Sequence, residues 1–427
     1  MLGLIPVLHA AIPAPADWVP ARWPWADTKS LDLLDGSPVN CLILKSPSAD
    51  FITAAKSRGV VVLSVTGEPD DLTLTGESGL PAIHLTARNR MQLGSAAPII
   101  GTSQGVWPGV AVEEEGAHKA GPTSSVWIDT NTGFLRAVRA WGTSTVWIAN
   151  LPPEKTVVTT ARYLQAIADA GIIGARWVIA FDSDLAARLG RREEGALGTW
   201  KRMGALLAYF ERHPEWRAMR EAGQLAIVQD PAKGGLLSGG ILDMIATKHT
   251  PVRPVPKERL SPQALTGATM AVNIDGDGLD AEQRDILRNF ARGGGTLLNG
   301  PPGWKDPAPK GGAITLDKDE LARLGDMWRD VNGMIGRRNL GVRLFNVASM
   351  LSNYVSEPAG KTAVVQLVNY ADYPVENVTL HYLADLPHAT LITPEGAEKK
   401  LEVYKIEDGW GVDIDRVSTC AAIRLSP

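Results

Sequence analysis

The hydrophobic pattern changes its period near residue 342, and this change constrains the fold more than any other feature. From residue 39 to about 216, short continuous apolar runs alternate with helical patterns. After residue 342 the alternation is residue by residue, as where Val378 and Leu380 flank Thr379. Continuous apolar strands between helices are typical of a parallel sheet covered on both faces, whereas strict alternation indicates a half-buried antiparallel sheet. The chain is therefore predicted to combine two kinds of domain.

The first region is predicted to form a (β/α) barrel, reduced or irregular in its helices. Its clearest strand-like runs are VNCLILK (39–45), VVVLSVT (60–66), TVWIAN (145–150) and ARWVIAFD (175–182), with others at 82–87, 99–103 and 109–114. A helix is expected over 156–170, where Val157, Ala161, Leu164 and Ala168 share one face. Seven or eight strands in about 200 residues suit a compact barrel better than an open sheet.

A second α/β pattern begins after His213-Pro214 and is predicted to form a small doubly wound domain. Strands are expected in QLAIVQD (224–230), TMAVNIDG (269–276) and GTLLNG (295–300), and helices over 234–249 and 317–327. Asp280 and Gln283 have the spacing of a capping box, which predicts a helix start at this point. The period-two strands that follow predict a C-terminal antiparallel β-sandwich.

These patterns divide the chain into four ranges. Residues 1–16 are interpreted as the remnant of a secretory signal, 17–220 as the barrel, 221–340 as the α/β domain with a connector, and 341–427 as the sandwich. The apolar start followed by Ala14-Pro15-Ala16 predicts a secreted or periplasmic protein. An ordinary N-terminal arm is the alternative interpretation of the same residues.

Composition narrows the classes of ligand. The net charge is −4 and no basic stripe is present, which argues against nucleic acid as a partner. No apolar run reaches the roughly 20 residues that a membrane helix needs. The two Cys lack the spacing of a zinc site, and His84 and His118 are isolated, so neither a metal nor a cofactor is expected. Trp outnumbers Phe and Tyr, with 13 against 6 and 7, which favours a carbohydrate ligand, although core packing also uses Trp.

Two longer segments carry a resemblance to a known family. The segment LSPQALTGATMAVNIDGDGLDAEQRDILRNFARGGGTLLNGPPG (260–303) resembles the amidotransferase-like "trimerisation" domain of bacterial β-galactosidases. The segment VQLVNYADYPVENVTL (365–380) resembles the sandwiches that end many glycoside hydrolases. The order of barrel, α/β domain and sandwich is similar to that family as well. The resemblance implies a glycoside hydrolase-like protein with a carbohydrate substrate, which forms a homo-oligomer such as a trimer.

The sequence also departs from that family. The Asn-Glu pair that supplies the acid/base in the wider retaining clan does not occur, so no catalytic residue is carried over by motif. The middle domain has no Cys for amidotransferase chemistry, which leaves a structural role for it.

Candidate catalytic residues are therefore chosen from carboxylates that follow strand-like runs. Glycoside hydrolysis typically uses two carboxylates, and a barrel places such residues at the carboxyl ends of its strands. Glu114 is the first choice because it shares a strand face with Val110 and Val112, and Asp129 and Asp182 are the others. A solvated acidic loop is the alternative for Glu114, and a helix N-cap is the alternative for both aspartates.

Four more residues are candidates for sugar binding: Trp107, Glu113, Trp127 and Asn131. Indole rings stack on sugar faces, and polar side chains bind hydroxyl groups, whereas the alternative for Trp107 is a core residue at a turn. Three functions stay open at this point. They are a glycoside hydrolase with acid/base carboxylates, a non-catalytic carbohydrate-binding or scaffold relative, and a metal-dependent hydrolase.

Overall fold

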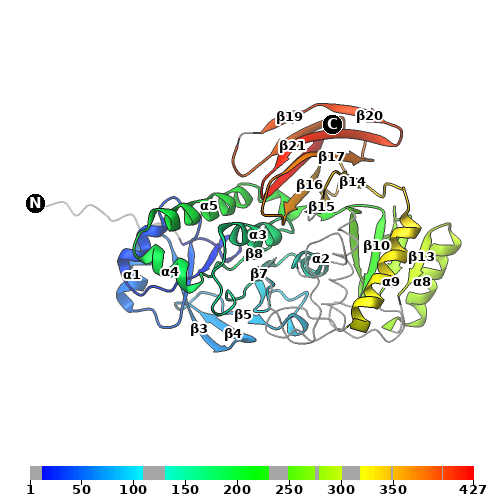
Figure 1. The fold of residues 1–427 in the computed structure, drawn as a ribbon. Coiled ribbons are helices and arrows are strands. Elements are labelled where there is room, and N and C mark those ends of the chain that lie inside the picture. Colours follow the sequence, from blue (N-terminus) through cyan, green and yellow to red (C-terminus); the bar gives the residue numbers. More distant parts are fainter. Residues whose placement is uncertain are drawn as a thin grey trace, which may run out of the picture.

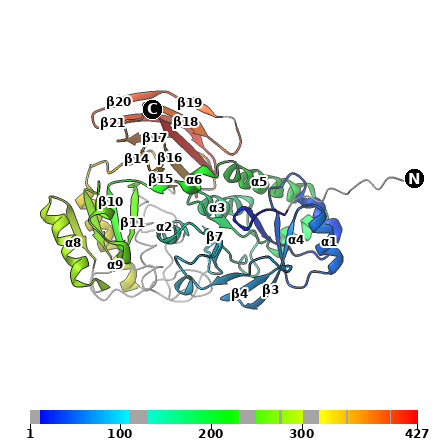
Figure 2. The ribbon, with the colours of Figure 1, turned by 180° about the vertical axis from the view of Figure 1, so that it is seen from behind.

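The computed structural model describes residues 12–108, 130–229, 249–274, 278–300, 318–347, 350–396 and 398–427. Most of residues 1–16, the predicted signal remnant, lie outside these ranges, as does the helix predicted over 234–249. Figures 1 and 2 show the barrel beside the α/β unit, with the sandwich lying across one side of the barrel. None of the described helices has both the length and the apolar character needed to cross a bilayer.

Eight strands in sequential order form the barrel, which confirms the predicted fold, although the strand predicted at 109–114 lies outside the described residues. They are β1 (Pro20–Arg22), β2 (Cys41–Leu44), β3 (Val61–Glu68), β4 (Asp71–Thr75), β5 (Ile83–Thr86), β6 (Ile99–Thr102), β7 (Thr145–Ile148) and β8 (Arg176–Trp177). A bridge between Ala21 and Ile179 brings the two edges together. The amide of Arg22 also donates to the carbonyl oxygen of Ile179 at 2.7 Å, so the end of β1 is fixed where the barrel closes.

One strand departs from the predicted parallel arrangement. β4 runs antiparallel to both β3 and β5, and a tight hairpin at Pro69-Asp70 joins it to β3. Leu72 and Leu74 are buried, which is the alternation expected of a strand. Gly67 has a φ of +101°, and a Cβ at that position would collide with the carbonyl oxygen of Asp71, so the hairpin requires glycine.

Six described helices accompany the barrel strands. They are α1 (Ala49–Ser57), α2 (Thr132–Trp141), α3 (Thr160–Gly171), α4 (Ser183–Gly190), α5 (Glu194–Glu211) and α6 (Glu215–Ala218). The predicted helix over 156–170 is α3, and it starts later because Thr159 is its N-cap and accepts a hydrogen bond from the amide of Arg162. The predicted face of this helix is buried at Leu164 and Ala168, but Val157, which was predicted to share it, precedes the helix and is exposed.

The second unit is a four-stranded parallel sheet in the order β11-β10-β12-β13. Its elements are β10 (Leu225–Gln229), β11 (Val252–Pro256), β12 (Met270–Asn273), α8 (Ala281–Arg292), β13 (Thr296–Asn299) and α9 (Lys318–Ile335). The capping box of Asp280 and Gln283 is confirmed at the start of α8. α9 extends beyond the predicted residue 327, because Met327, Val331 and Ile335 continue its buried face.

The C-terminal region is a two-sheet β-sandwich, as the period-two pattern predicts. Its strands are β14 (Val342–Phe345), β15 (Met350–Ser356), β16 (Ala363–Asn369), β17 (Val375–Tyr382), β18 (His388–Ile392), β19 (Lys399–Leu401), β20 (Val403–Ile406), β21 (Gly409–Val417) and β22 (Cys420–Ser426). One sheet has the order β14-β17-β21-β20, and the other β19-β18-β22-β16-β15-β9. The edge strand β9 (Arg220–Glu221) precedes the α/β unit in the chain.

The sandwich and the barrel share one hydrophobic core. Leu351 and Val364 of the sandwich belong to the same buried cluster as Ile167 of α3 and Leu206 of α5. Hydrogen bonds cross this seam too, and one joins the side-chain amide of Asn353 to the carbonyl oxygen of Ile172 at 2.9 Å. The two thiols, Cys41 and Cys420, are free and buried in different clusters. The sandwich is therefore an integral part of the barrel's packing.

Candidate functional site

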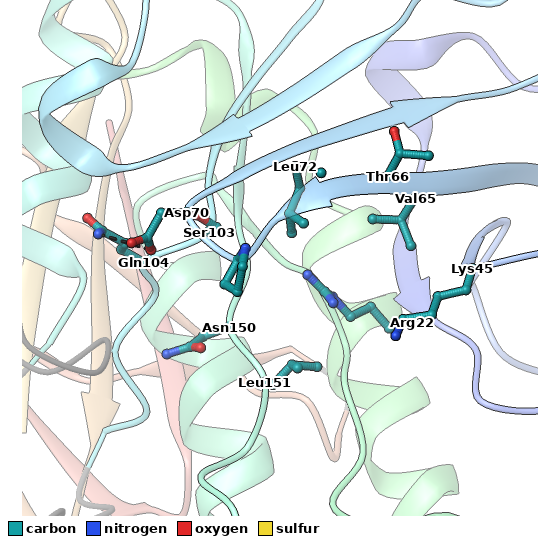
Figure 3. A pocket seen from close by; sticks show the side chains of 12 residues that line it. Arg22, Lys45, Val65, Thr66, Asp70, Leu72, Ser103, Gln104, Asn150 and Leu151 are labelled. Atoms are coloured by element: carbon teal, nitrogen blue, oxygen red, sulfur yellow. Dashed lines mark hydrogen bonds between the residues drawn. The ribbon is translucent and has the colours of Figure 1, made fainter.

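A pocket of about 600 Å³ lies at the carboxyl-terminal mouth of the barrel. Its wall is formed by residues of β1, β3 and β4, by the β3–β4 hairpin, and by the residues that follow β2, β6 and β7. Figure 3 shows Arg22 and Lys45 on one side of the pocket, and Asp70, Gln104 and Asn150 on the other. Because barrel enzymes bind substrates at this face, the pocket is the best candidate site in the described structure.

Asp70 is the one carboxylate among the described residues of the pocket wall. It lies at the tip of the β3–β4 hairpin and is exposed. Its Oδ1 accepts a hydrogen bond from Nε2 of Gln104 at 3.3 Å, and its carbonyl oxygen accepts one from Nη2 of Arg90 at 2.8 Å. The hairpin thus holds this carboxylate at the pocket, with most of its hydrogen-bonding capacity open to a ligand.

Two cations occupy the opposite wall. Arg22 ends β1 and is half-buried, and its buried Nε has no hydrogen-bond partner in the described structure. Burial lowers the pKa of the Arg22 guanidinium, although arginine stays charged at every physiological pH. Lys45 follows β2 and is exposed. The described wall therefore carries two positive charges against one negative charge.

Neutral polar groups complete the wall. Ser103, which follows β6, is 9% exposed, and its buried Oγ has no hydrogen-bond partner among the described residues. Oε1 of Gln104 accepts from the amide of Arg88 at 3.0 Å, so this carboxamide is held from both ends. Nδ2 of Asn150 donates to the carbonyl oxygen of Gly105 at 2.7 Å. Fixed carboxamides and a buried hydroxyl are suited to binding sugar hydroxyl groups.

Trp107 is a core residue in the described structure. It is 4% exposed, and its indole nitrogen donates to the carbonyl oxygen of Leu151 at 3.0 Å. Its ring packs edge-to-face on Tyr163 and Trp177, with centroid distances of 5.5 and 4.9 Å. The alternative interpretation of Trp107, a core residue at a turn, agrees with these contacts.

Asn131 belongs to a fully buried polar network. Its Oδ1 accepts from Nη2 of Arg88 at 2.7 Å and from the amide of Val106 at 2.8 Å, and its Nδ2 donates to Oδ2 of Asp169 at 2.8 Å. Tyr370 of the sandwich donates its hydroxyl hydrogen to the other oxygen of Asp169. The network therefore fixes the start of α2 to α3 and to the sandwich.

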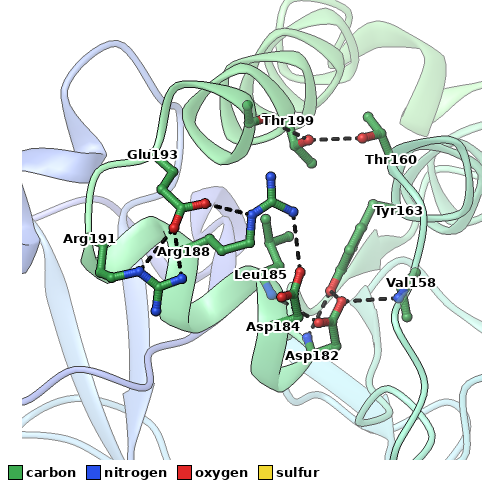
Figure 4. Close-up of polar contacts among 11 residues, drawn as sticks. Val158, Thr160, Tyr163, Asp182, Asp184, Leu185, Arg188, Arg191, Glu193 and Thr199 are labelled. Atoms are coloured by element: carbon green, nitrogen blue, oxygen red, sulfur yellow. Dashed lines mark hydrogen bonds and ion pairs between the residues drawn. The ribbon is translucent and has the colours of Figure 1, made fainter.

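Asp182 is the N-cap of α4, so that interpretation is confirmed. Its Oδ1 accepts from the amide of Leu185 at 2.9 Å. Its Oδ2 accepts from the hydroxyl of Tyr163 at 2.7 Å and from the amide of Val158 at 3.1 Å, as Figure 4 shows. Asp182 is only 5% exposed, and both of its carboxylate oxygens accept hydrogen bonds.

None of Trp107, Asn131 and Asp182 lines the pocket. The other predicted site residues, Glu113, Glu114, Trp127 and Asp129, lie outside the described residues. Their predicted roles stay predictions. The residues that the sequence reasoning missed are Asp70, Arg22 and Lys45. The sequence offers a signal for Lys45 alone, because it ends an apolar run. Asp70 depends on the position of the hairpin, and Arg22 on the position where the barrel closes.

The buried network around Asp169 should make the stability of the protein depend on pH. Burial raises the pKa of Asp169 above the ordinary carboxyl value, although hydrogen bonds from Tyr370 and Asn131 and the charge of Arg88 oppose the shift. The folded state thus holds this proton more tightly than the unfolded chain does. The contribution of Asp169 to stability is then largest below its unfolded pKa, and it is lost as pH rises through the higher folded pKa.

We therefore expect the Asp169→Asn variant, which has no proton to lose, to gain stability relative to the wild type as pH rises from about 4 to 7. Urea unfolding of both proteins at the two pH values measures this difference. A difference that stays constant, or that moves in favour of the wild type, would contradict the prediction.

No protein-family model and no curated protein matches the sequence. Solved structures do match the fold. α-L-Fucosidase isoenzyme 2 from Paenibacillus thiaminolyticus aligns with a TM-score of 0.57 and 9% identity, covering 98% of this chain and 99% of that one.

Two other solved structures align less well. A catalytic mutant of Gan42B, a GH42 β-galactosidase from G. stearothermophilus, gives a TM-score of 0.45 at 10% identity, covering 88% of this chain and 66% of that one. A rhamnosidase from Novosphingobium sp. PP1Y gives 0.44 at 14% identity, covering 69% and 33%. The fucosidase, in contrast, aligns over nearly the full length of both chains. The chain has the fold of a glycoside hydrolase-like TIM-barrel protein.

Proposed function

We propose that this protein hydrolyses a glycoside in the pocket at the barrel mouth, with Asp70 as one member of a carboxylate pair. The observation that carries the proposal is the pocket itself, which has a volume of about 600 Å³ and places a carboxylate opposite two cations. Carboxamides beside the carboxylate offer partners for sugar hydroxyls. The structural likeness to a fucosidase supports a sugar as the ligand class.

Hydrolysis by this route needs a second carboxylate. The sequence predicts Glu114 or Asp129 for that role, and both belong to the segment that joins β6 to α2. A separation of about 5–5.5 Å between the two carboxyl groups would give retention of configuration, and about 6.5–9.5 Å would give inversion. One group protonates the leaving oxygen, while the other attacks the anomeric carbon or activates water.

A non-catalytic carbohydrate-binding protein is the second candidate. The observation in its favour is that the described wall of the pocket has a single carboxylate, surrounded by neutral and cationic groups. Such a wall can bind a sugar without cleaving it. The two candidates share the pocket and the ligand class, and they differ only in turnover.

A screen of chromogenic aryl glycosides, run beside calorimetric titration with the parent sugars, separates these functions. Release of the chromophore supports the hydrolase, and sugar binding without release supports the binding protein. The Val65→Trp variant should abolish either signal, because the Val65 side chain points into the pocket and an indole there would fill it. Thr75→Trp is the matched control, since Thr75 is on the same hairpin but does not line the pocket. Neither turnover nor binding by the wild type would overturn the proposal.

A further inference from the structure

The charges of the pocket wall indicate that its ligand is negatively charged. We infer that the carbohydrate carries an anionic group, the carboxylate of a uronic acid or a sulfate ester, and that Arg22 and Lys45 bind this group. The inference rests on the proposed function, because it names the class of sugar that the same pocket takes.

The side chain of Arg22 has a buried donor that meets no acceptor among the described residues. The backbone of Arg22 is fixed by the hydrogen bond from its amide to the carbonyl oxygen of Ile179 and by the pairing of β1 with β2. Its Nε is buried and has no hydrogen-bond partner in the part of the chain that the structure describes. A buried donor left in this state costs free energy, and a ligand oxygen placed against it would remove that cost. The side chain lines the pocket, so a bound ligand can reach it.

Lys45 places a second charge beside Arg22. In the barrel, Arg22 is paired with Ile43 of β2, and Lys45 is two residues beyond Ile43. Residues two apart on an extended chain point to the same side, so both cations face the same pocket. In the described residues neither cation forms an ion pair. Asp70, the carboxylate of the wall, lies on the opposite side and accepts from Gln104.

This arrangement favours an anion over a neutral hydroxyl group. A guanidinium presents a planar set of donors that matches the oxygens of a carboxylate or sulfate, and a lysine ammonium adds a point charge. A neutral hydroxyl could satisfy Nε of Arg22 but would leave both charges uncompensated. With the anionic group held at Arg22 and Lys45, the sugar ring would extend toward Asp70, Gln104 and Asn150.

Calorimetric titration with D-galactose, D-galacturonate and D-galactose 6-sulfate tests the inference. We expect at least one anionic sugar to bind about tenfold or more tightly than galactose at low salt. The two anionic probes distinguish a carboxylate ligand from a sulfate ligand. The preference should weaken as salt is added, because screening reduces the attraction between charges near the surface.

Substitutions of the two cations test whether they cause the preference for an anionic sugar. Arg22→Gln and Lys45→Gln should each reduce the preference for the anion, whereas Arg22→Lys should keep part of it. Lys400→Gln should change nothing, because Lys400 is an exposed lysine of the sandwich strand β19 and is outside the pocket. Lys45 is exposed, so its variant is expected to fold even if Arg22→Gln does not.

If galactose binds as tightly as both anionic probes, the inference is overturned while the proposed function stands. The same holds if the anionic probes bind more tightly but the Lys45→Gln and Arg22→Gln variants keep the full preference. If the wild type binds none of the three sugars, the inference is overturned, and the glycoside screen decides the proposed function separately.

Discussion

Replacing Asp70 with asparagine is expected to slow the hydrolysis of an active glycoside by about 10²–10⁴-fold, the range typical for loss of an acid/base group. The amide keeps the size of the side chain and can still contact Gln104, but it can neither release a proton nor carry a negative charge. Asp70 is exposed at a hairpin tip, so the variant should stay folded. Steady-state rates with the substrate found by the screen measure the effect.

Asp71→Asn is the matched control for this experiment. Asp71 is the next residue, is exposed like Asp70, and lies 3.6 Å from Arg90 in an ion pair. It lines a different pocket, on the other side of the strand, and not the pocket at the barrel mouth. Its variant should therefore keep nearly full activity. Equal activity in the two variants would remove Asp70 from the chemistry.

Replacing Arg139 with methionine is expected to destabilise the protein by about 3–5 kcal/mol, as is usual when one partner of a buried ion pair is removed. The side chains of Arg139 and Glu221 are only 8% and 6% exposed, and Nη1 lies 3.2 Å from Oε1. Nη1 is aimed at the carbonyl oxygen of Ile173, at 2.9 Å, so its contact with Oε1 is electrostatic and is not an aligned hydrogen bond. Nη2 of Arg139 donates to the carbonyl oxygen of Met219 at 2.7 Å. Methionine would leave Glu221 without its counter-charge and these carbonyl oxygens without their donor.

Two variants provide the comparison in urea unfolding followed by Trp fluorescence. Glu221→Gln should cost less than Arg139→Met, because the arginine would keep its bonds to the carbonyl oxygens. Arg58→Met removes an exposed ion pair with Asp32 in the same barrel and should cost only about 1 kcal/mol or less. A loss in Arg139→Met no greater than that in Arg58→Met would show that the buried pair contributes little.

The architecture could be predicted from the sequence because each kind of sheet has its own hydrophobic period. The capping box at Asp280 and Gln283 could also be predicted, since both of its hydrogen bonds join residues three apart in the sequence. β4 was not predicted, because its five residues follow β3 almost at once and contain only two buried leucines. The run at 175–182 was predicted as a long strand, yet only Arg176–Trp177 and a bridge at Ile179 pair in the barrel. An apolar run shows that a segment is buried, but it does not show how much of the segment is paired.

The position of the site was easier to predict than its residues. The rule that places functional groups at the carboxyl ends of parallel strands predicts the mouth of the barrel, where the pocket lies. That rule points to the carboxyl end of β3, but Asp70 lies two residues beyond this end, in a hairpin that the apolar pattern does not reveal. The rule did select Asp182, which ends an apolar run but serves as an N-cap. Arg22 and Lys45 are far apart in sequence, and only the pairing of β1 with β2 brings them together.

The strand β9 has a consequence for the order in which the protein can fold during synthesis. Residues 220–221 reach the sandwich sheet only by pairing with Val355 and Ser356 of β15, which a ribosome would make after the whole α/β unit. The apolar faces of α3 and α5 must likewise wait for Leu351, Val364 and their neighbours. Domains usually fold in the order in which they are made. Here the barrel, although it is made before the sandwich, would keep the apolar faces of α3 and α5 uncovered until the sandwich strands follow.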